Sequence, residues 1–334
     1  GQLRKSGRPY FGHCISVAQL LAEWNMDIYT IVGGMLHDCI EDTNASYDEI
    51  TKEFGEEVAE LVDGVTKLGG VEFDSRKEKQ AENLMKMFLS MAKDLRVVII
   101  KFADRLHNMR TIEYLPLIKQ RRIAVETRDV YSPLAHRLGM FQIKSELDDL
   151  VLNTLEPDAY REIEKLLKST GGKRKKTLKE ITEPIKQQLG DHNVTYNLKT
   201  RLKSHASIHN KMVSREKLFD EIYDIFALRI IVSDVPECYS TLGLIHQLFT
   251  PVHERFKDFL ARPKINGYQS LHTTVIGPSG KMVEIQIRTE EMDRTAEIGV
   301  AAHWKYKENG KKKGDMDKHV QWLRDLVSIL SDES

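Results

Sequence analysis

Through the first half of the chain, the apolar residues recur at the spacing of α-helices. One helical face is formed by positions i, i+3, i+4, i+7 and i+8, which here hold Ile28, Ile31, Val32, Met35 and Leu36. Residues 97–109 form a second long, apolar-rich segment that we also predict to be helical. No segment before Asn193 has the composition of a strand. We therefore predict that this half of the chain is all-α.

Residues that cap helices mark several of the predicted helix ends. Ser46 and Glu49 have the spacing of a capping box, ahead of a helix that Gly55 is expected to close. The dipeptide Ser132-Pro133 is typical of an N-cap with proline at the first helical position. Two further helices are predicted over 156–190, with a break at a pair of glycines.

From about residue 193 the pattern changes to short β-branched and apolar runs. Strands are predicted over three such runs, 225–232, 270–276 and 282–289. The last two flank residues 277–280, whose composition indicates a turn. Helices are predicted over 204–219, 235–247 and 293–306. The second half therefore has the pattern of an α+β domain around a largely antiparallel sheet.

Composition limits the class of protein. The 334 residues favour two domains, and 41% hydrophobic with 30% charged residues is ordinary for a globular protein. Lys and Arg together number 50, as do Asp and Glu, and this zero balance argues against direct DNA binding. No apolar run approaches the about 20 residues of a membrane span, so we expect no membrane association. Three scattered cysteines fit a reducing, cytoplasmic compartment.

Four candidate metal ligands come from three of the predicted helices. They are His13, His37, Asp38 and Asp104. Two imidazoles and two carboxylates can hold a divalent cation and leave positions open for water and phosphate. Glu41 and Asp42 follow the His37-Asp38 pair by four residues, so one helix end presents all four side chains to a single cleft. Each residue alone would be unremarkable in a helix, but the set favours phosphohydrolase chemistry.

The helix predicted over 97–109 carries a polar stripe on an otherwise apolar segment. Its residues, at positions i, i+3, i+7 and i+10, are Lys101, Asp104, Asn108 and Thr111. Burying this stripe without partners would be costly, whereas a metal and a bound phosphate would satisfy it. Cys14 and Cys39 each adjoin a candidate ligand, but adjacent helical residues point about 100° apart. We expect these two cysteines to be packing residues.

A second pair of carboxylates lies in the α+β half. The strand predicted over 282–289 alternates, with Glu284, Gln286 and Arg288 on one side. Such alternation more commonly indicates a strand with one face exposed to solvent. Asp224, however, directly precedes another predicted strand, so Asp224 and Glu284 could meet across neighbouring strands. They could then share a metal, as phosphoryl transfer requires.

Basic residues and a tyrosine accompany this carboxylate pair. The basic residues are Arg201, Lys203, Lys211, Arg255, Lys257 and Lys264. Ser207 lies one helical turn before Lys211. Tyr268 follows a glycine in a Lys/Asn-rich loop, which suits a platform for stacking a nucleotide base. Taken singly, each of these is commonly an ordinary surface residue.

The candidate ligands match the H…HD…D pattern of HD-domain metal phosphohydrolases. Longer segments around them resemble the hydrolase domain of the RelA/SpoT homologues, enzymes that make and destroy the alarmone (p)ppGpp. These segments are residues 4–7, 37–43, 62–68 and 103–111. The resemblance extends over essentially the whole chain.

This resemblance implies roles for the residues of the first half. The four ligands would bind Mn²⁺, while Glu41 and Asp42 would position or deprotonate the attacking water. The nucleotide would be held by Arg4, Lys5, Ser6, Lys101, Asn108 and Thr111, with Arg4 near the π-face of guanine. The implied reaction removes pyrophosphate from the 3′ position.

The second half resembles the (p)ppGpp synthetase core, a relative of the nucleotidyltransferases. The likeness is carried by residues 268–274 and 284–289. For ATP it implies that Arg201 and Arg229 sandwich the adenine and that the phosphates contact Lys203, Ser207 and Lys211. Asp224 would ligate Mg²⁺. Glu284 would activate the acceptor 3′-hydroxyl or share the metal.

The same likeness implies a second nucleotide, GDP or GTP, as the acceptor of the transferred group. Tyr268 would stack on its guanine, and its phosphates would contact Lys264, Asn266 and His272. Gln286 and Arg288 would complete the floor of the site. Lys257 belongs to Arg255-Phe256-Lys257-Asp258, which matches the basic version of a motif seen in bifunctional members.

Together these likenesses imply a bifunctional enzyme of the stringent response. It would transfer pyrophosphate from ATP to the 3′-hydroxyl of GDP or GTP, releasing AMP, and would hydrolyse (p)ppGpp. The implied domains are an HD-type hydrolase over 1–155, a helical connector over 156–195 and a synthetase over 196–310. A hinge and helix over 311–334 would lead to regulatory domains of a longer protein. Ribosome contact is expected only through those domains.

Three other interpretations remain open on the sequence. The first is an active hydrolase with a weak or vestigial synthetase. The second is a nucleotide sensor without turnover, against which the complete sets of acidic residues count. The third is an HD phosphohydrolase that acts on other nucleotides.

Overall fold

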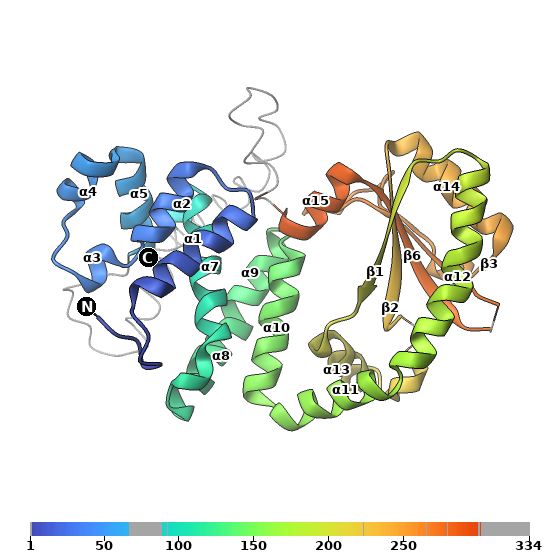
Figure 1. Ribbon diagram of the computed structural model, residues 1–334, viewed down its shortest axis with the longest axis horizontal. Coiled ribbons are helices and arrows are strands. Elements are labelled where there is room, and N and C mark those ends of the chain that lie inside the picture. The colour runs from blue at the N-terminus through green and yellow to red at the C-terminus, as the bar shows by residue number, and fades with distance from the viewer. Residues whose placement is uncertain are drawn as a thin grey trace, which may run out of the picture. The chain divides into compact units, whose positions relative to one another are not determined.

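The computed structural model describes residues 2–66, 89–91, 93–222, 224–264, 266–278, 280–299 and 301. The chain forms two compact units, which divide between Ile123 and Ala124, with the second unit ending at Gly299 (Figure 1). The hinge and helix predicted over 311–334, and the end of the helix predicted over 293–306, lie outside the described residues.

The described part of the first unit is helical, as predicted. Its helices are α1 (Phe11–Glu23), α2 (Ile28–Leu36), α3 (Cys39–Asp42), α4 (Tyr47–Phe54), α5 (Glu56–Val65), α7 (Arg96–Arg110), the 3₁₀ turn Ile112–Tyr114, and α8 (Leu117–Glu126), which runs into the second unit. Helix α7 is central because α1, α2 and α5 all pack against it. Its apolar residues are shielded from solvent, with Val98, Ile99, Ile100 and Phe102 each 0% exposed.

Caps explain where some of these helices begin. The predicted capping box is confirmed: Ser46 Oγ accepts a hydrogen bond from Glu49 N at 3.2 Å, and Glu49 Oε2 accepts one from Ser46 N at 2.9 Å. Gly55 ends α4, also as predicted. The predicted N-cap at Ser132 is wrong. A π-helical turn over Thr127–Tyr131 continues into the next helix, so Ser132 has helical backbone and its hydroxyl donates to Asp148 instead.

The second unit is α+β. Its elements are α9 (Ser132–Arg137), α10 (Phe141–Leu155), α11 (Pro157–Ser169), α12 (Gly171–Asp191), β1 (Tyr196–Leu202), α13 (His205–Ser214), the 3₁₀ turn Phe219–Glu221, β2 (Phe226–Val232), α14 (Val235–Leu248), β3 (Thr250–Pro251), the 3₁₀ turn His253–Arg255, β4 (Lys257–Asp258), β5 (Leu271–Ile276), β6 (Met282–Thr289) and α15 (Glu290–Ile298). The predicted break between two helices falls at Thr170, and the three predicted strands are confirmed. Strand β1 was not predicted, because its lysine, arginine and asparagine residues hide its β character.

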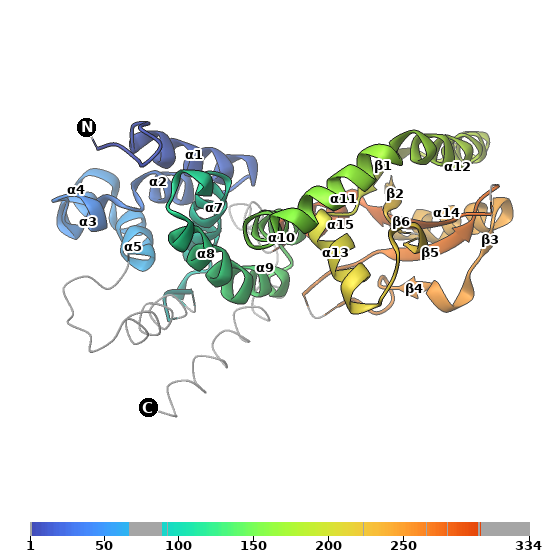
Figure 2. The ribbon, with the colours of Figure 1, turned by 90° about the horizontal axis from the view of Figure 1, so that it is seen from below.

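The sheet has the strand order β1-β2-β6-β5-β3, with β4 also paired to β5 (Figure 2). All pairs are antiparallel except β2 with β6, which is parallel. The predicted, largely antiparallel sheet is therefore confirmed. The parallel pair matters for function because it aligns two strands that each carry candidate site residues.

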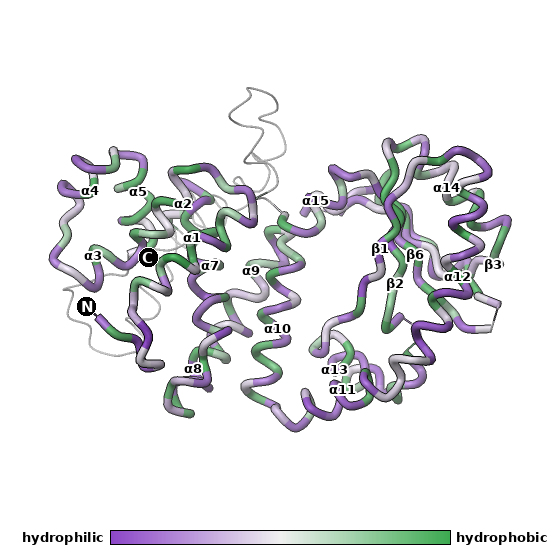
Figure 3. The backbone as a smooth tube through the Cα atoms, in the orientation of Figure 1, coloured by the Kyte–Doolittle hydropathy of each residue, from purple (hydrophilic) through white to green (hydrophobic). Residues whose placement is uncertain are grey.

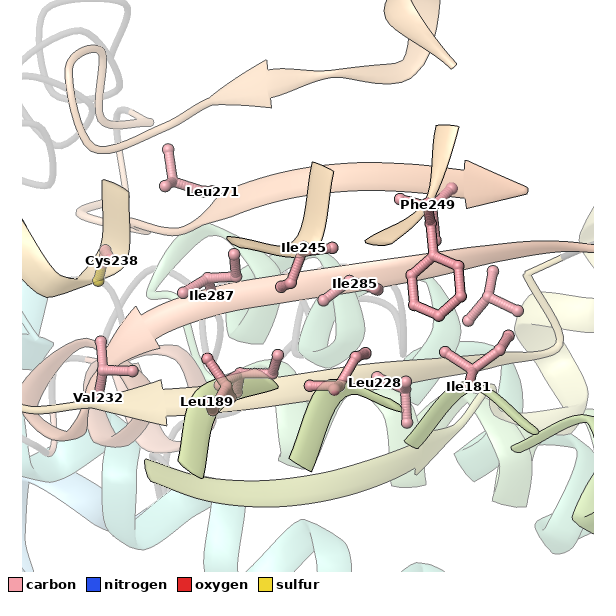
Figure 4. Packing of buried hydrophobic residues seen from close by; sticks show 14 of the residues in the cluster. Ile181, Leu189, Leu228, Val232, Cys238, Ile245, Phe249, Leu271, Ile285 and Ile287 are labelled. Carbon is pink, nitrogen blue, oxygen red and sulfur yellow. The ribbon is translucent and has the colours of Figure 1, made fainter. Parts of the chain in front are cut away.

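One face of the sheet is apolar and forms the core of the unit. Strands β2, β5 and β6 turn Leu228, Ile285, Ile287 and Leu271 toward residues of α12 and α14, such as Ile181 and Ile245 (Figure 4). Hydrophobic residues are accordingly concentrated in β2, whereas long stretches of α12 are hydrophilic (Figure 3). Because side chains alternate along a strand, the residues between these positions lie on the opposite face.

That opposite face is polar. The register places Arg229 of β2 beside Gln286 of β6, and Gln286 beside His272 of β5. Glu284 of β6 is likewise beside Ala227, which is itself opposite Arg201 of β1. Four strands, β1, β2, β5 and β6, therefore present candidate site residues on one surface.

Within the described residues, no helix has the length and apolar character needed to cross a bilayer.

Gly299 is expected to tolerate no side chain. Its φ is +56°, and a Cβ there would lie 2.2 Å from Leu138 O and 2.5 Å from Gly139 C, both backbone atoms. Gly299→Ala should therefore destabilise the second unit by about 3 kcal/mol or more, through backbone strain and overpacking. Urea unfolding followed by circular dichroism measures this loss. The matched control is Gly243→Ala in α14, where a Cβ meets open space and alanine should stabilise the helix by up to about 1 kcal/mol. Equal unfolding midpoints for the two variants would contradict the prediction.

Candidate active sites

The four predicted metal ligands come together in the first unit. His13 Nε2 lies 3.2 Å from Asp104 Oδ1 and 3.7 Å from Asp38 Oδ2. His37 Nε2 lies 3.0 Å from Asp38 Oδ2 and 3.8 Å from Asp104 Oδ1. Ligand atoms of His13, His37 and Asp104 all lie within 4.8 Å of one another. Two imidazole nitrogens and two carboxylate oxygens thus converge on one small volume.

The histidines present the nitrogens that a cation needs. His13 is 2% exposed and His37 is 1% exposed. His37 Nδ1 lies 2.7 Å from Gly34 O and donates to it, so Nε2 is the ring nitrogen that is left for a cation. His37 Nε2 is buried and has no hydrogen-bond partner among the described residues. An orphaned imidazole nitrogen beside two carboxylates fits a divalent cation.

The two carboxylates of this cluster, Asp38 and Asp104, are stabilised by a neighbouring positive charge. Burial disfavours a charged His37, but the neighbouring carboxylates of Asp104 and Asp38 outweigh burial and raise the pKa of His37 to about 10. Burial likewise disfavours ionised Asp104, yet His13 and His37 hold the pKa of that carboxyl well below its usual range. A proton on the imidazole thus supplies positive charge to the two carboxylates. A divalent cation supplies the same charge in its place.

One phenol contacts the ligand Asp38, and two carboxylates follow Asp38 in the sequence. Tyr10, which the sequence patterns did not reveal, donates from its Oη to Asp38 Oδ2 at 2.6 Å. Burial and Asp38 raise the pKa of Tyr10, so the phenol stays protonated. Glu41 and Asp42 lie in the short helix α3 directly after Asp38, and both are exposed. Both carboxylates are therefore accessible to water.

The predicted nucleotide-binding residues of the first unit lie partly beside the ligands. Arg4 donates to Asn108 Oδ1, and its Nη1 lies 3.5 Å from Thr111 Oγ1. Asn108 Nδ2 in turn donates to Asp104 Oδ1 at 2.6 Å. Lys101 is 9% exposed, and its charge is one of the groups that lower the pKa of Asp104.

Lys5 and Ser6 lie in the turn that follows Arg4, where Ser6 Oγ accepts from Arg8 N at 3.4 Å. Lys5 and Ser6 are therefore next in sequence to Arg4, which is connected to the ligand Asp104 through Asn108. His107 was not singled out from the sequence, although it contacts both Arg4 and His13.

The second site is built on the polar face of the sheet. Asp224 Oδ2 accepts from Lys203 Nζ at 2.5 Å and also from Lys211. Although burial opposes ionisation, the two lysines lower the pKa of Asp224. Asp224 Oδ1 is buried and has no hydrogen-bond partner within the described chain. One oxygen of this carboxylate is therefore held by cations while the other is available to a ligand.

Asp224 and Glu284 line the same cavity. This cavity of about 90 Å³ is also lined by Arg201, Lys203, Ser204, Ser207, Ala227 and Gln286. Glu284 Oε1 accepts from Gln286 Nε2 at 2.7 Å. Ser204 caps α13 and also bonds Ser207 through its hydroxyl at 2.8 Å. Two carboxylates among basic side chains fit a magnesium ion with phosphate groups.

Two predicted arginines are held by helix α15. Arg229 Nη1 lies 2.9 Å from Asp293 Oδ1 and 2.6 Å from Glu297 Oε1. Arg288, 1% exposed, reaches Asp293 Oδ1 at 2.6 Å. Burial disfavours ionised Asp293, but Arg288 and Arg229 lower its pKa. Asp293 and Glu297 were not predicted; they lie four residues apart at the start and end of a helix that only the fold brings to the sheet.

The residues predicted for the acceptor nucleotide surround a buried tyrosine. Tyr268 is 8% exposed, and its Oη lies 2.7 Å from His272 Nε2. Lys264 Nζ lies 5.2 Å from the Tyr268 ring centroid, a cation–π distance. Asn266 donates to His136 O at 3.2 Å, and Lys257 is exposed beside His272 on the neighbouring strand. Burial, with Lys264 and Arg288 next, lowers the pKa of His272 to about 3, so this imidazole is neutral.

A larger cavity of about 500 Å³ joins these groups. Its lining includes Arg201, Arg229, Tyr268, Gln286 and Arg288, together with residues of helix α10 that were not predicted, namely Phe141, Gln142, Ser145, Glu146 and Asp149. A volume of this size suits a nucleotide-sized ligand.

The chain thus combines a ligand cluster suited to a divalent cation with a separate basic, carboxylate-bearing cavity on a mixed sheet. A model of the HD domain matches residues 1–141, and a model of the region found in RelA/SpoT proteins matches residues 200–311. The chain belongs to the RelA/SpoT homologues.

Curated relatives match along almost the whole chain. A probable guanosine-3′,5′-bis(diphosphate) 3′-pyrophosphohydrolase of Synechocystis is 49% identical over 99% of the chain and 44% of its own length. The bifunctional (p)ppGpp synthase/hydrolase SpoT of Escherichia coli K12 is 48% identical over 98% of the chain and 47% of its own length. A GTP pyrophosphokinase of Myxococcus xanthus is 48% identical over 99% of the chain and 44% of its own length. The chain therefore spans a little under half the length of these relatives.

Proposed function

We propose that the chain is a bifunctional alarmone enzyme that both makes and hydrolyses (p)ppGpp. The observation that carries this proposal is the presence of two separately built sites, one in each unit. Further support comes from the 48% identity, over 98% of the chain, to a relative named a bifunctional (p)ppGpp synthase/hydrolase. We assign hydrolysis to the first unit and synthesis to the second.

In the hydrolytic site the residues of this chain have three tasks. His13, His37, Asp38 and Asp104 hold Mn²⁺, which when bound acts as a Lewis acid on the 3′-pyrophosphate. Glu41 and Asp42 orient the attacking water and accept its proton. The guanine nucleotide is held by Arg4, Lys5, Ser6, Lys101, Asn108 and Thr111. The bond between the 3′-oxygen and phosphorus breaks, leaving GDP or GTP and pyrophosphate.

In the synthetic site the 3′-oxygen of GDP or GTP attacks the β-phosphorus of ATP. Glu284 accepts the proton of that hydroxyl, the bond from the β-phosphorus to the bridging oxygen breaks, and AMP leaves. Asp224, with Glu284, holds Mg²⁺, which offsets charge on the transferring group. Lys203 and Lys211, now paired with Asp224, are placed to move onto the ATP phosphates beside Ser207.

The remaining residues select and orient the two nucleotides. We propose that Arg201 and Arg229 hold the adenine of ATP between them. The acceptor is held by Lys257, Lys264, Asn266, Tyr268, His272, Gln286 and Arg288. Tyr268 is buried among other rings, so stacking on guanine requires a rearrangement of its neighbours Lys264 or Phe259. We further propose that neither reaction needs a ribosome.

Paired assays on the purified chain test this function. With Mg²⁺, ATP and GDP we expect AMP and ppGpp, and with Mn²⁺ and ppGpp we expect GDP and pyrophosphate. Hydrolysis without AMP release would identify a vestigial synthetase. If neither substrate is turned over, the chain is a nucleotide sensor without catalytic activity. Equal hydrolysis of nucleotides that lack a 3′-pyrophosphate would identify a different HD phosphohydrolase.

A further inference from the structure

His107 lies between a nucleotide-binding arginine and a metal ligand. Its Nδ1 is 3.1 Å from Arg4 Nη1 and 2.7 Å from His13 Nδ1. The His107 and His13 rings have centroids 4.7 Å apart and are tilted by 46°. His107 is on helix α7, one turn after the ligand Asp104. None of the roles assigned so far uses this imidazole.

The donors around His107 determine which of its nitrogens carries a proton. An arginine guanidinium can only donate hydrogen bonds, so His107 Nδ1 must accept from Arg4 and bears a lone pair. The same Nδ1 can then only accept from His13, whose own Nδ1 must carry the proton. With the proton on Nδ1 fixed in this way, Nε2 is the nitrogen of His13 left to bind a cation, and it is the nitrogen that faces Asp104 and Asp38.

A second connection runs in parallel from the same arginine. Arg4 donates to Asn108 Oδ1, and Asn108 Nδ2 donates to Asp104 Oδ1 at 2.6 Å. Two of the four ligands are thus each joined to Arg4 through one intervening side chain of α7. Groups that hold the outer atoms of metal ligands set their orientation and the affinity of the site.

We propose that His107 is a positioning residue that fixes the tautomer and orientation of His13 and so links the nucleotide-binding Arg4 to the cation site. This role rests on the proposed hydrolytic function only in naming the ligand of Arg4 as a guanine nucleotide. The link between His107, His13 and cation affinity holds whichever phosphate ester the site cleaves.

Cation binding by three variants of the whole chain tests this role. Free Mn²⁺ is measured by electron paramagnetic resonance, without nucleotide. His107→Leu removes the acceptor and should weaken Mn²⁺ binding about 10- to 100-fold. His107→Asn keeps an acceptor near the position of Nδ1 and should stay within about threefold of the wild type. His192→Leu, an exposed histidine at the end of α12, is the matched control and should bind as the wild type does.

A spectroscopic readout separates positioning from general packing. Long-range ¹H–¹⁵N spectra of the metal-free chain should show His13 protonated on Nδ1 and His107 on Nε2. In His107→Leu the His13 signals should become those of mixed tautomers. If His107→Leu folds poorly, the spectra of the wild type and of His107→Asn still test the proposal, because both should show His13 protonated on Nδ1.

Two results would overturn the proposal. One is unchanged Mn²⁺ affinity in His107→Leu, and the other is an equal loss in His107→Leu and His107→Asn. Failure of the proposed function looks different: Mn²⁺ binding would follow the pattern above while (p)ppGpp stays intact.

Discussion

His37→Ala is expected to abolish Mn²⁺-dependent release of pyrophosphate from (p)ppGpp and to leave synthesis from ATP intact. The imidazole Nε2 is one of four atoms that converge on the cation position, and no other described residue offers a nitrogen to replace it. Lewis-acid stabilisation is worth several kcal/mol, so its loss should lower kcat by about 10³-fold or more. The measurement is pyrophosphate release in parallel with AMP release on the same preparation.

The design of this experiment guards against unfolding. Alanine also removes the bond from His37 Nδ1 to Gly34 O, which anchors the end of α2. Circular dichroism and retained AMP release show that the chain is folded. His192→Ala is a histidine substitution at an exposed helix end and should leave both reactions unchanged. Hydrolysis by His37→Ala at more than about a tenth of the wild-type rate would remove the basis of the metal assignment.

The first site was predictable because its chemistry is local in the sequence. His37 and Asp38 are adjacent, and Glu41 and Asp42 follow within four residues, so closeness in the sequence brings these four together. The single helix end predicted for them is wrong, because α2 ends at Leu36 and Glu41 and Asp42 lie in the separate short helix α3. Asp104 was recognisable as a carboxylate in an apolar helix, where burial demands a partner. Such reasoning needs only the residue types and the spacing of a single element.

Partners that depend on tertiary packing were not predictable in this way. Tyr10 is 28 residues from Asp38, and His107 is 94 residues from His13. Nothing in the local pattern around Tyr10 or His107 distinguishes a supporting residue from a packed aromatic ring. The same holds for Asp293, which reaches Arg229 only because α15 folds back onto the strand pair β2–β6.

In the sheet, strand β6 was predictable from its sequence, whereas strand β1 was not. Alternation in β6 correctly separated Glu284, Gln286 and Arg288 from the apolar positions between them. Strand β1 escaped notice because most of its residues are polar, although Tyr196 and Leu198 pack against the core of the unit. Its register with β2 is what carries Arg201 to the cavity that Asp224 and Glu284 line. Pairing partners, unlike periodicity, follow from the whole fold.

Glu284→Gln is expected to abolish release of AMP from ATP and GDP while leaving hydrolysis of (p)ppGpp unchanged. The substitution keeps the shape of the side chain and an oxygen that can accept from Gln286, but it removes the negative charge. A neutral amide can neither accept the proton of the 3′-hydroxyl nor balance Mg²⁺ beside Asp224. Loss of a general base lowers rates by about 10²- to 10⁴-fold, and loss of cation affinity adds to this.

Comparison with two other variants makes the result specific. Glu291→Gln changes an exposed carboxylate in the first turn of α15, outside both cavities, and should retain synthesis. His37→Ala should show the reciprocal pattern, with synthesis retained and hydrolysis lost. Each of these two variants is then its own folding control, because Glu284→Gln keeps hydrolysis and His37→Ala keeps synthesis. If Glu284→Gln still forms AMP at the wild-type rate, the carboxylate is not the proton acceptor and Asp224 becomes the remaining candidate. If Glu284→Gln and His37→Ala each lose both activities, the two units do not hold independent centres.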